Sequence, residues 1–150
     1  MRKGLDSMFD RLIESLGRTN QIDDSAQGRV VENQLAAAML LYSVLPADHV
    51  IVPQESMELR LALQHLFFLT DLKSRHLITR AVSAHARDPS LVACATILKH
   101  RFSFAFRRRL LGAAHRIAMS DGRLHDNEAD VLARMSLLLG LNATEHRLSA

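Results

Sequence analysis

Residues 113–128 have the sequence AAHRIAMSDGRLHDNE, in which an apolar run is followed by a polar loop and then by acidic residues. Asp121 begins an Asp-Gly pair, which is typical of tight turns, and Leu124 and Glu128 follow it. A glutamate is favourable in the first turn of a helix, where it faces the positive end of the helix dipole. The pattern therefore predicts two helices joined by a loop over 120–125.

The same unit occurs 73 residues earlier in a diverged form. There Asp48, Ile51 and Glu55 repeat the spacing of the acid, the aliphatic residue and the glutamate. The two copies cover about 30–70 and 103–143. This internal repeat predicts two helix-loop-helix units related by an approximate twofold axis.

Apolar residues at helical spacing continue along the rest of the chain, and no segment shows the alternating pattern of a strand. Pro46 closes one apolar helix, Pro53 suits the first turn of the next, and Gly140 suits the position after the last. The sequence therefore predicts an all-α fold, a helical bundle of about seven helices. The expected helices cover about 5–16, 28–45, 53–67, 71–85, 89–100, 104–119 and 126–139.

Two helix starts are expected at aspartates. Asp71 is the expected N-cap of its helix, because an aspartate side chain accepts hydrogen bonds from the first N–H groups. The Asp88-Pro89 pair is expected to begin the next helix. Residues 1–24 are expected to form an N-terminal amphipathic helix with a linker, and residues 25–150 an all-helical domain.

The composition is typical of a single cytoplasmic domain. The chain has 150 residues, a formal net charge of +3, one cysteine and no tryptophan. Cys94 has no second cysteine to pair with, and its apolar neighbours indicate a buried thiol. No signal peptide is apparent, and the longest apolar run, Leu35 to Leu45, is shorter than the roughly 20 residues of a transmembrane helix. We therefore expect a cytoplasmic location and no transmembrane segment.

The second loop also matches the latter half of a calcium-binding EF-hand loop, with its acid, glycine, apolar anchor and final glutamate. An EF-hand needs further oxygen ligands at its first and third positions. Those positions fall on Ile117 and Met119 here. A true EF-hand is therefore excluded.

Residues 113–128 resemble the repeat signature of the tellurite-resistance protein B (TerB-like) family, an apolar helix followed by Asp-Gly, an aliphatic residue and acids ending in glutamate. The resemblance extends over about Val30 to Leu148, and the chain is also similar to the N-terminal portion of the DjlA co-chaperone. It implies a non-enzymatic interaction module of the bacterial stress response, with another protein as the expected partner.

The resemblance also implies an acidic surface able to hold a divalent cation (Ca, Mn or Zn). The residues that match are Asp48, Glu55, Asp121 and Glu128, with Asp126 as a possible addition. This chain departs from the family pattern at His49, Gln54 and Asn127, where glycine or further acids are expected. Each departure removes flexibility or ligand charge, on which calcium affinity depends. The alternative interpretation of the same acids is that they are turn and cap residues.

Two other functions follow from different residues. A basic cluster, Arg101 with Arg107, Arg108 and Arg109, lies among three phenylalanines and would suit anionic lipid or nucleic acid. Consecutive arginines point in several directions, so a solvated helix face explains this cluster as well. A metallohydrolase using His49 or His125 with the carboxylates is the third and last hypothesis. The histidines near the two loops are His49, His115 and His125.

Overall fold

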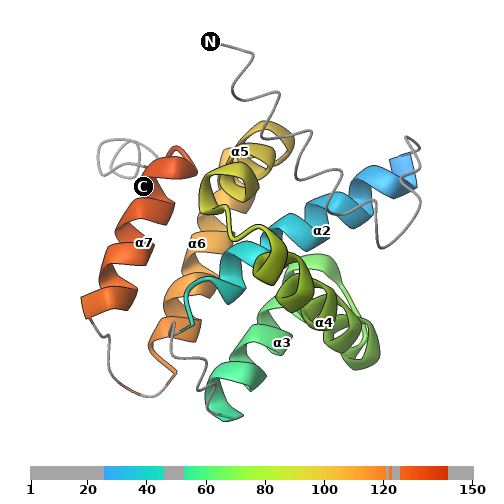
Figure 1. Cartoon of the computed structure of the whole chain (residues 1–150), viewed down its shortest axis with the longest axis horizontal. Helices are drawn as coiled ribbons and strands as arrows, with labels where there is room; N and C mark the ends of the chain where they lie inside the picture. Colours follow the sequence, from blue (N-terminus) through green and yellow to red (C-terminus); the bar gives the residue numbers. More distant parts are fainter. Residues whose placement is uncertain (1–25, 46–52, 121, 123–125, 142–150) are drawn as a thin grey trace.

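The computed structural model describes residues 26–45, 53–120, 122 and 126–141 (Figure 1). Within these residues the structure is all-helical, with six helices and no strand. This confirms the all-α bundle. The helices are α2 (Ala26–Tyr42), α3 (Pro53–Phe67), α4 (Asp71–Arg87), α5 (Leu91–Arg101), α6 (Phe104–Ala118) and α7 (Asp126–Leu138).

Helix α2 crosses the middle of the molecule and packs against α3, α4, α5 and α6 (Figure 1). Every residue from Leu35 to Leu41 is buried. The apolar run thus forms the central core helix that its composition predicts. The helix ends at Tyr42, three residues earlier than expected, because Val44 and Leu45 donate their N–H groups to carbonyls only three residues back, in a tighter turn.

The starts of α4 and α5 differ from the sequence expectation by one or two residues. Thr70 is the N-cap of α4, and its side chain accepts a hydrogen bond from the Lys73 N–H. Asp71 lies inside the first turn. Ser90 is the N-cap of α5, whereas Asp88 is the C-cap of α4. In both cases a neighbouring hydroxyl has the extended backbone that an N-cap needs, and it takes the position expected for the aspartate.

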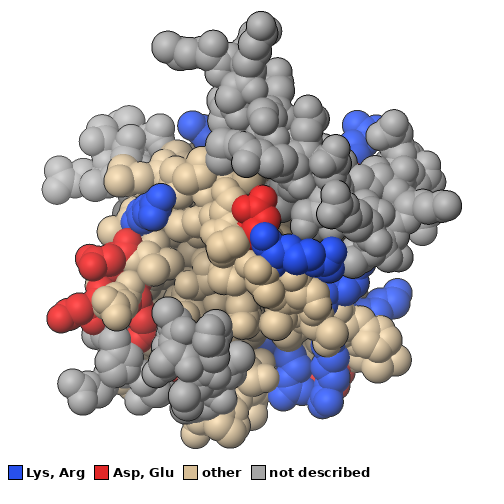
Figure 2. Space-filling model, viewed as in Figure 1, with Lys and Arg blue, Asp and Glu red and all other residues tan. Residues whose placement is uncertain are grey.

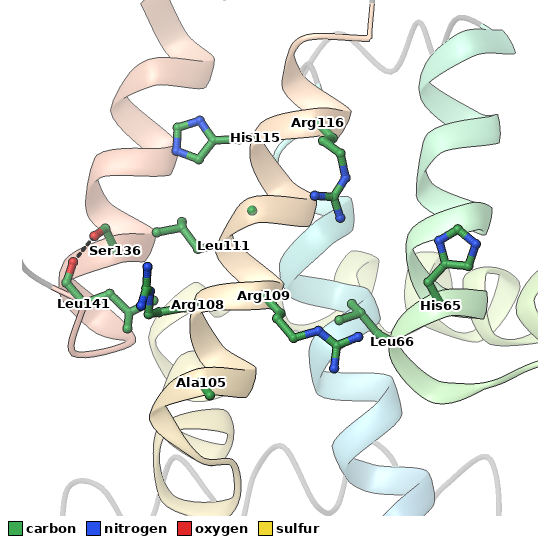
Figure 3. Close-up of a pocket in the computed structure, with 11 residues that line it drawn as sticks. His65, Leu66, Ala105, Arg108, Arg109, Leu111, His115, Arg116, Ser136 and Leu141 are labelled. Carbon is green, nitrogen blue, oxygen red and sulfur yellow. Dashed lines mark hydrogen bonds between the residues drawn. The ribbon is translucent and has the colours of Figure 1, made fainter. Parts of the chain in front are cut away.

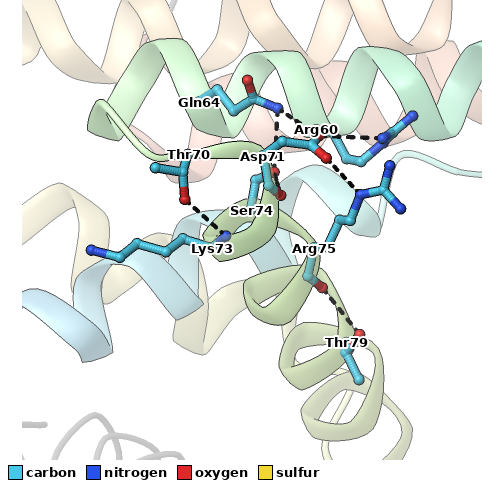
Figure 4. Close-up of polar contacts among 8 residues, drawn as sticks. All are labelled: Arg60, Gln64, Thr70, Asp71, Lys73, Ser74, Arg75 and Thr79. Carbon is cyan, nitrogen blue, oxygen red and sulfur yellow. Dashed lines mark hydrogen bonds and ion pairs between the residues drawn. The ribbon is translucent and has the colours of Figure 1, made fainter.

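Asp71 instead joins α3 to α4 through its carboxylate (Figure 4). The carboxylate lies 2.8 Å from Arg75 Nε and 3.3 Å from Arg60 Nη1, and it accepts a hydrogen bond from Gln64. Arg60 and Gln64 belong to α3, so this network fixes the turn between the two helices. The Asp71 carboxylate therefore has a structural role.

The second helix pair agrees closely with expectation. Helix α6 begins after the N-cap Ser103 and α7 begins at Asp126. Gly140 has a φ of 73°, and the N–H of Leu141 bonds to the carbonyl of Ser136. These are the marks of a glycine-terminated helix, as the sequence predicts.

Both predicted helix-loop-helix units form packed helix pairs, α2 with α3 and α6 with α7, and α3 also packs on α6. The helix expected over about 5–16 and the division at residues 24 and 25 lie outside the described residues. The count of about seven helices and the approximate twofold axis therefore stay predictions. None of the helices in the described part is long and apolar enough to cross a membrane.

Candidate functional site

Glu55 and Glu128 occupy the same position in their two helices. Each is the third residue of its helix, α3 or α7. Each is also buried, with exposed fractions of 5% and 4%. Acidic side chains are rarely buried unless they have a partner, and both residues have interaction partners within the protein. One buried carboxylate therefore lies in the first turn of α3 and one in the first turn of α7.

This position has two chemical uses. A glutamate at the third helical residue can accept a hydrogen bond from the backbone N–H of the N-cap residue, as in a capping box. A carboxylate at the start of a helix, next to a loop, can also provide a cation ligand, as the last glutamate of an EF-hand does. Glu55 and Glu128 have the position along the helix that both uses need, and both side chains are buried.

The other predicted members of the acidic site are less well placed. Asp48 and Asp121 lie outside the described residues, as do His49 and His125. Asp126 is exposed in the first turn of α7. Among the residues that the structure describes, no three histidine, cysteine, aspartate or glutamate side chains come close enough to hold a metal ion.

The two helix starts nevertheless share one side of the molecule. The N-terminal ends of α3 and α7 both lie along the lower edge of Figure 1. Acidic side chains gather over α7 at the left of the same view (Figure 2). Glu55 and Glu128 therefore lie in the first turns of two helices that start at this edge.

The four arginines of the predicted basic cluster do not form one continuous surface. Arg101 binds inward: its Nη1 lies 2.8 Å from a carboxylate oxygen of the buried Glu32 and 3.0 Å from the side-chain oxygen of Asn33, both on α2. Arg107 donates to the backbone carbonyl of Leu139, at the end of α7. Two of the four arginines thus hold helices together and do not form an open basic surface.

Arg108 and Arg109 line an open groove of about 880 Å³, which follows α6 between α3 and the end of α7 (Figure 3). Arg116 and His115, further along α6, also line it, and His65 faces it from α3. Its complete lining is His65, Leu66, Ala105, Arg108, Arg109, Leu111, Gly112, His115, Arg116, Ser136 and Leu141.

The run of consecutive arginines in the sequence does not indicate this groove, because its lining follows one face of α6. Residues 105, 108, 109, 112 and 116 follow the three- and four-residue spacing of one helix face. That spacing unites Arg109 with Arg116 and separates both from Arg107. His65 belongs to another helix, so no local pattern could have assigned it to the groove.

In a comparison with protein families, the model of the tellurite resistance protein TerB family matches residues 34–149. The chain belongs to the TerB family. Neither the curated proteins nor the solved structures give a significant match. The TerB match covers the second helix-loop-helix unit, most of the first and the whole groove, and it confirms the family expected from residues 113–128. The similarity to DjlA stays an expectation.

Proposed function

We propose that this TerB-family domain is a non-catalytic binding module that acts in the bacterial cytoplasm as part of a tellurite-resistance-type stress response. In this proposal the starts of α3 and α7 hold a divalent cation, and the loaded acidic surface binds a protein partner. The observation that supports it is the pair of buried carboxylates, Glu55 and Glu128, at equivalent positions of the repeated unit.

Glu55 and Glu128 have interaction partners within the protein, and a bound cation would add an opposite charge beside these buried carboxylates. Calcium and manganese prefer oxygen ligands, and calcium takes at least six. One loop of this chain offers too few acids for such a site. We therefore propose one shared site, with Asp48, Asp121 and Asp126 as the ligands added to the two glutamates.

A metal titration tests this proposal. Metal-free protein is titrated with calcium, manganese and zinc by calorimetry, beside a double variant, Asp48→Asn and Asp121→Asn, that keeps side-chain shape and removes charge. The matched control is Glu58→Gln with Asp130→Asn, which removes two charges from α3 and α7 outside the proposed ligand set. We expect binding to the wild type and to the control, and a loss of at least about tenfold in the first variant.

The capping interpretation gives a different result. If Glu55 and Glu128 only accept backbone N–H groups, no metal binds to any of the proteins, and Glu128→Gln lowers the free energy of unfolding equally with and without metal. That outcome would reject the cation site. Membership of the TerB family would not be affected. The binding-module proposal would then be tested by pull-down with the metal-free domain.

A further inference from the structure

The groove along α6 has an uneven distribution of charge. Three arginines and two histidines line it, and none of the described lining residues is acidic. Arg109 and Arg116 are exposed and point from α6 towards α3 (Figure 3). In the described part of the chain, neither guanidinium has a carboxylate partner. This absence of acids distinguishes the groove from the environments of Arg75 and Arg101, which pair with Asp71 and Glu32.

An aromatic contact orients one of these guanidiniums. Arg109 lies over the ring of Phe106, 5.8 Å from its centroid, and Phe106 stacks on Phe102 with 4.3 Å between centroids. A side chain restrained in the free protein loses less entropy when it binds, so Arg109 is suited to ligand recognition. Arg116 lies near Gly112, where an added Cβ would be 3.7 Å from its Nη1.

The groove also has an apolar part. Leu66, Leu111 and Leu141 line it beside the cations, and Leu66 is buried. Its volume of about 880 Å³ lies within the range of pockets that take small molecules. The helical face from Ala105 to Arg116 spans roughly 16 Å at 1.5 Å per residue. These dimensions suit a compact ligand with one anionic end and one apolar end.

We propose that this groove binds a phosphorylated small molecule of about nucleotide size. Guanidinium groups form paired, charge-assisted hydrogen bonds with phosphate oxygens, a geometry that ammonium groups do not reproduce. Arg109 and Arg116 bind the phosphate groups, and the leucine side of the groove holds the base or another apolar body. The site is separate from the proposed cation site: it uses different residues and the opposite charge.

Calorimetry with ADP as the probe tests the proposal. The groove variant is Arg109→Gln with Arg116→Gln. The matched control is Arg87→Gln with Arg134→Gln, which removes the same charge from two exposed residues outside the groove. We expect the groove variant to bind ADP at least about tenfold more weakly, and the control to stay within about twofold of the wild type.

A third variant separates the groove from surface charge. Gly112→Leu keeps every charge and is compatible with a helix, because an added Cβ at Gly112 meets only ordinary contacts. Its side chain fills the middle of the groove, so we expect it to abolish ADP binding. Unchanged ADP binding in this variant, or equal loss in the groove variant and its control, would overturn the proposal.

Other probes identify the ligand class. Inorganic pyrophosphate should bind more weakly than ADP, because it has no apolar body to pack on the leucines. Pyrophosphate binding as tight as ADP binding would reject a nucleotide-sized ligand. The same conclusion would follow if ADP did not bind while phosphatidylserine vesicles or a single-stranded oligonucleotide bound tightly. Circular dichroism melts of all variants show that each protein is folded.

Discussion

Glu32 and Arg101 show how a single charged residue is assigned its role. They lie 69 positions apart in the chain, yet the Arg101 guanidinium reaches the Glu32 carboxylate where α5 packs on α2. Glu32 is 8% exposed, so the pair is partly removed from solvent. Breaking such a pair leaves a buried charge without its partner, which is more destabilising than breaking an exposed pair. Arg101 is therefore a structural residue.

Cys94 gives a prediction at the same scale. Burial, together with the negative charge of Asp88, raises the pKa of the Cys94 thiol to about 12. Only the thiolate is nucleophilic, so we expect no reaction of the folded protein with a disulfide reagent at pH 8. One thiol per chain should react after unfolding in guanidinium. Rapid reaction of the folded protein, followed by absorbance, would contradict this burial.

The same shift predicts a pH dependence of stability. Between the ordinary value of 9.0 and the folded value of about 12, the unfolded chain loses the thiol proton while the folded chain keeps it. The free energy of unfolding therefore falls as pH rises through this window. The stabilisation that comes from the raised pKa of the Cys94 thiol is fully present below pH 9. We expect the melting temperature of the wild type to fall more steeply from pH 9 to 11 than that of Cys94→Ala. Parallel slopes would contradict the assignment.

At the scale of the helices, local chemistry sets most of the boundaries. Thr70, Ser90 and Ser103 each accept the backbone N–H three residues later, so every one of these starts has a side-chain cap. The end of α3 is different, because Phe68 takes a φ of 55° without being glycine, and its side chain is 92% exposed. This conformation is unfavourable for a residue with a Cβ, and no glycine or asparagine in the sequence indicates it.

Two glycines give a matched prediction for these elements. Gly140 has a positive φ, and an added Cβ would lie 3.0 Å from Arg107 Nη1, so we expect Gly140→Ala to lower the free energy of unfolding by about 1–2 kcal/mol. Gly112 lies inside α6 with only ordinary contacts around it. Gly112→Ala should raise the free energy of unfolding by about 0.5–1 kcal/mol. Urea unfolding measures both, and changes of the same sign would be inconsistent with these two conformations.

At the scale of the whole molecule, the core is centred on α2. Four helices pack around it, and Leu40 is fully buried. Truncating such a side chain removes its transfer free energy and leaves a cavity, so we expect Leu40→Ala to lower the free energy of unfolding by about 3 kcal/mol. Leu137→Ala on α7 is the control, because Leu137 is 68% exposed and its loss should change stability by about 0.5 kcal/mol or less. Similar urea midpoints for the two variants would contradict a core centred on α2.

The helical class, the central apolar helix, the glycine end of α7 and membership of the TerB family can all be predicted from the sequence alone. The helical features depend on neighbours three or four residues apart, so a linear pattern contains them. The family follows from the signature of residues 113–128, and the TerB match over 34–149 confirms it. Glu55 and Glu128 were paired by the constant offset of 73 residues between the two predicted copies, and helix phase could have united Arg109 with Arg116.

Which charged side chains face solvent depends on how the helices pack, and the sequence pattern does not contain this information. Arg101 and Arg107 belong to the same basic segment as Arg108 and Arg109, but they bind Glu32 and the Leu139 carbonyl, which arrive from distant parts of the chain. His65 reaches the groove only because α3 packs on α6. The physical reason is that a side chain's partner depends on which helices meet, and that is set by packing around α2 and not by the residues beside it in sequence.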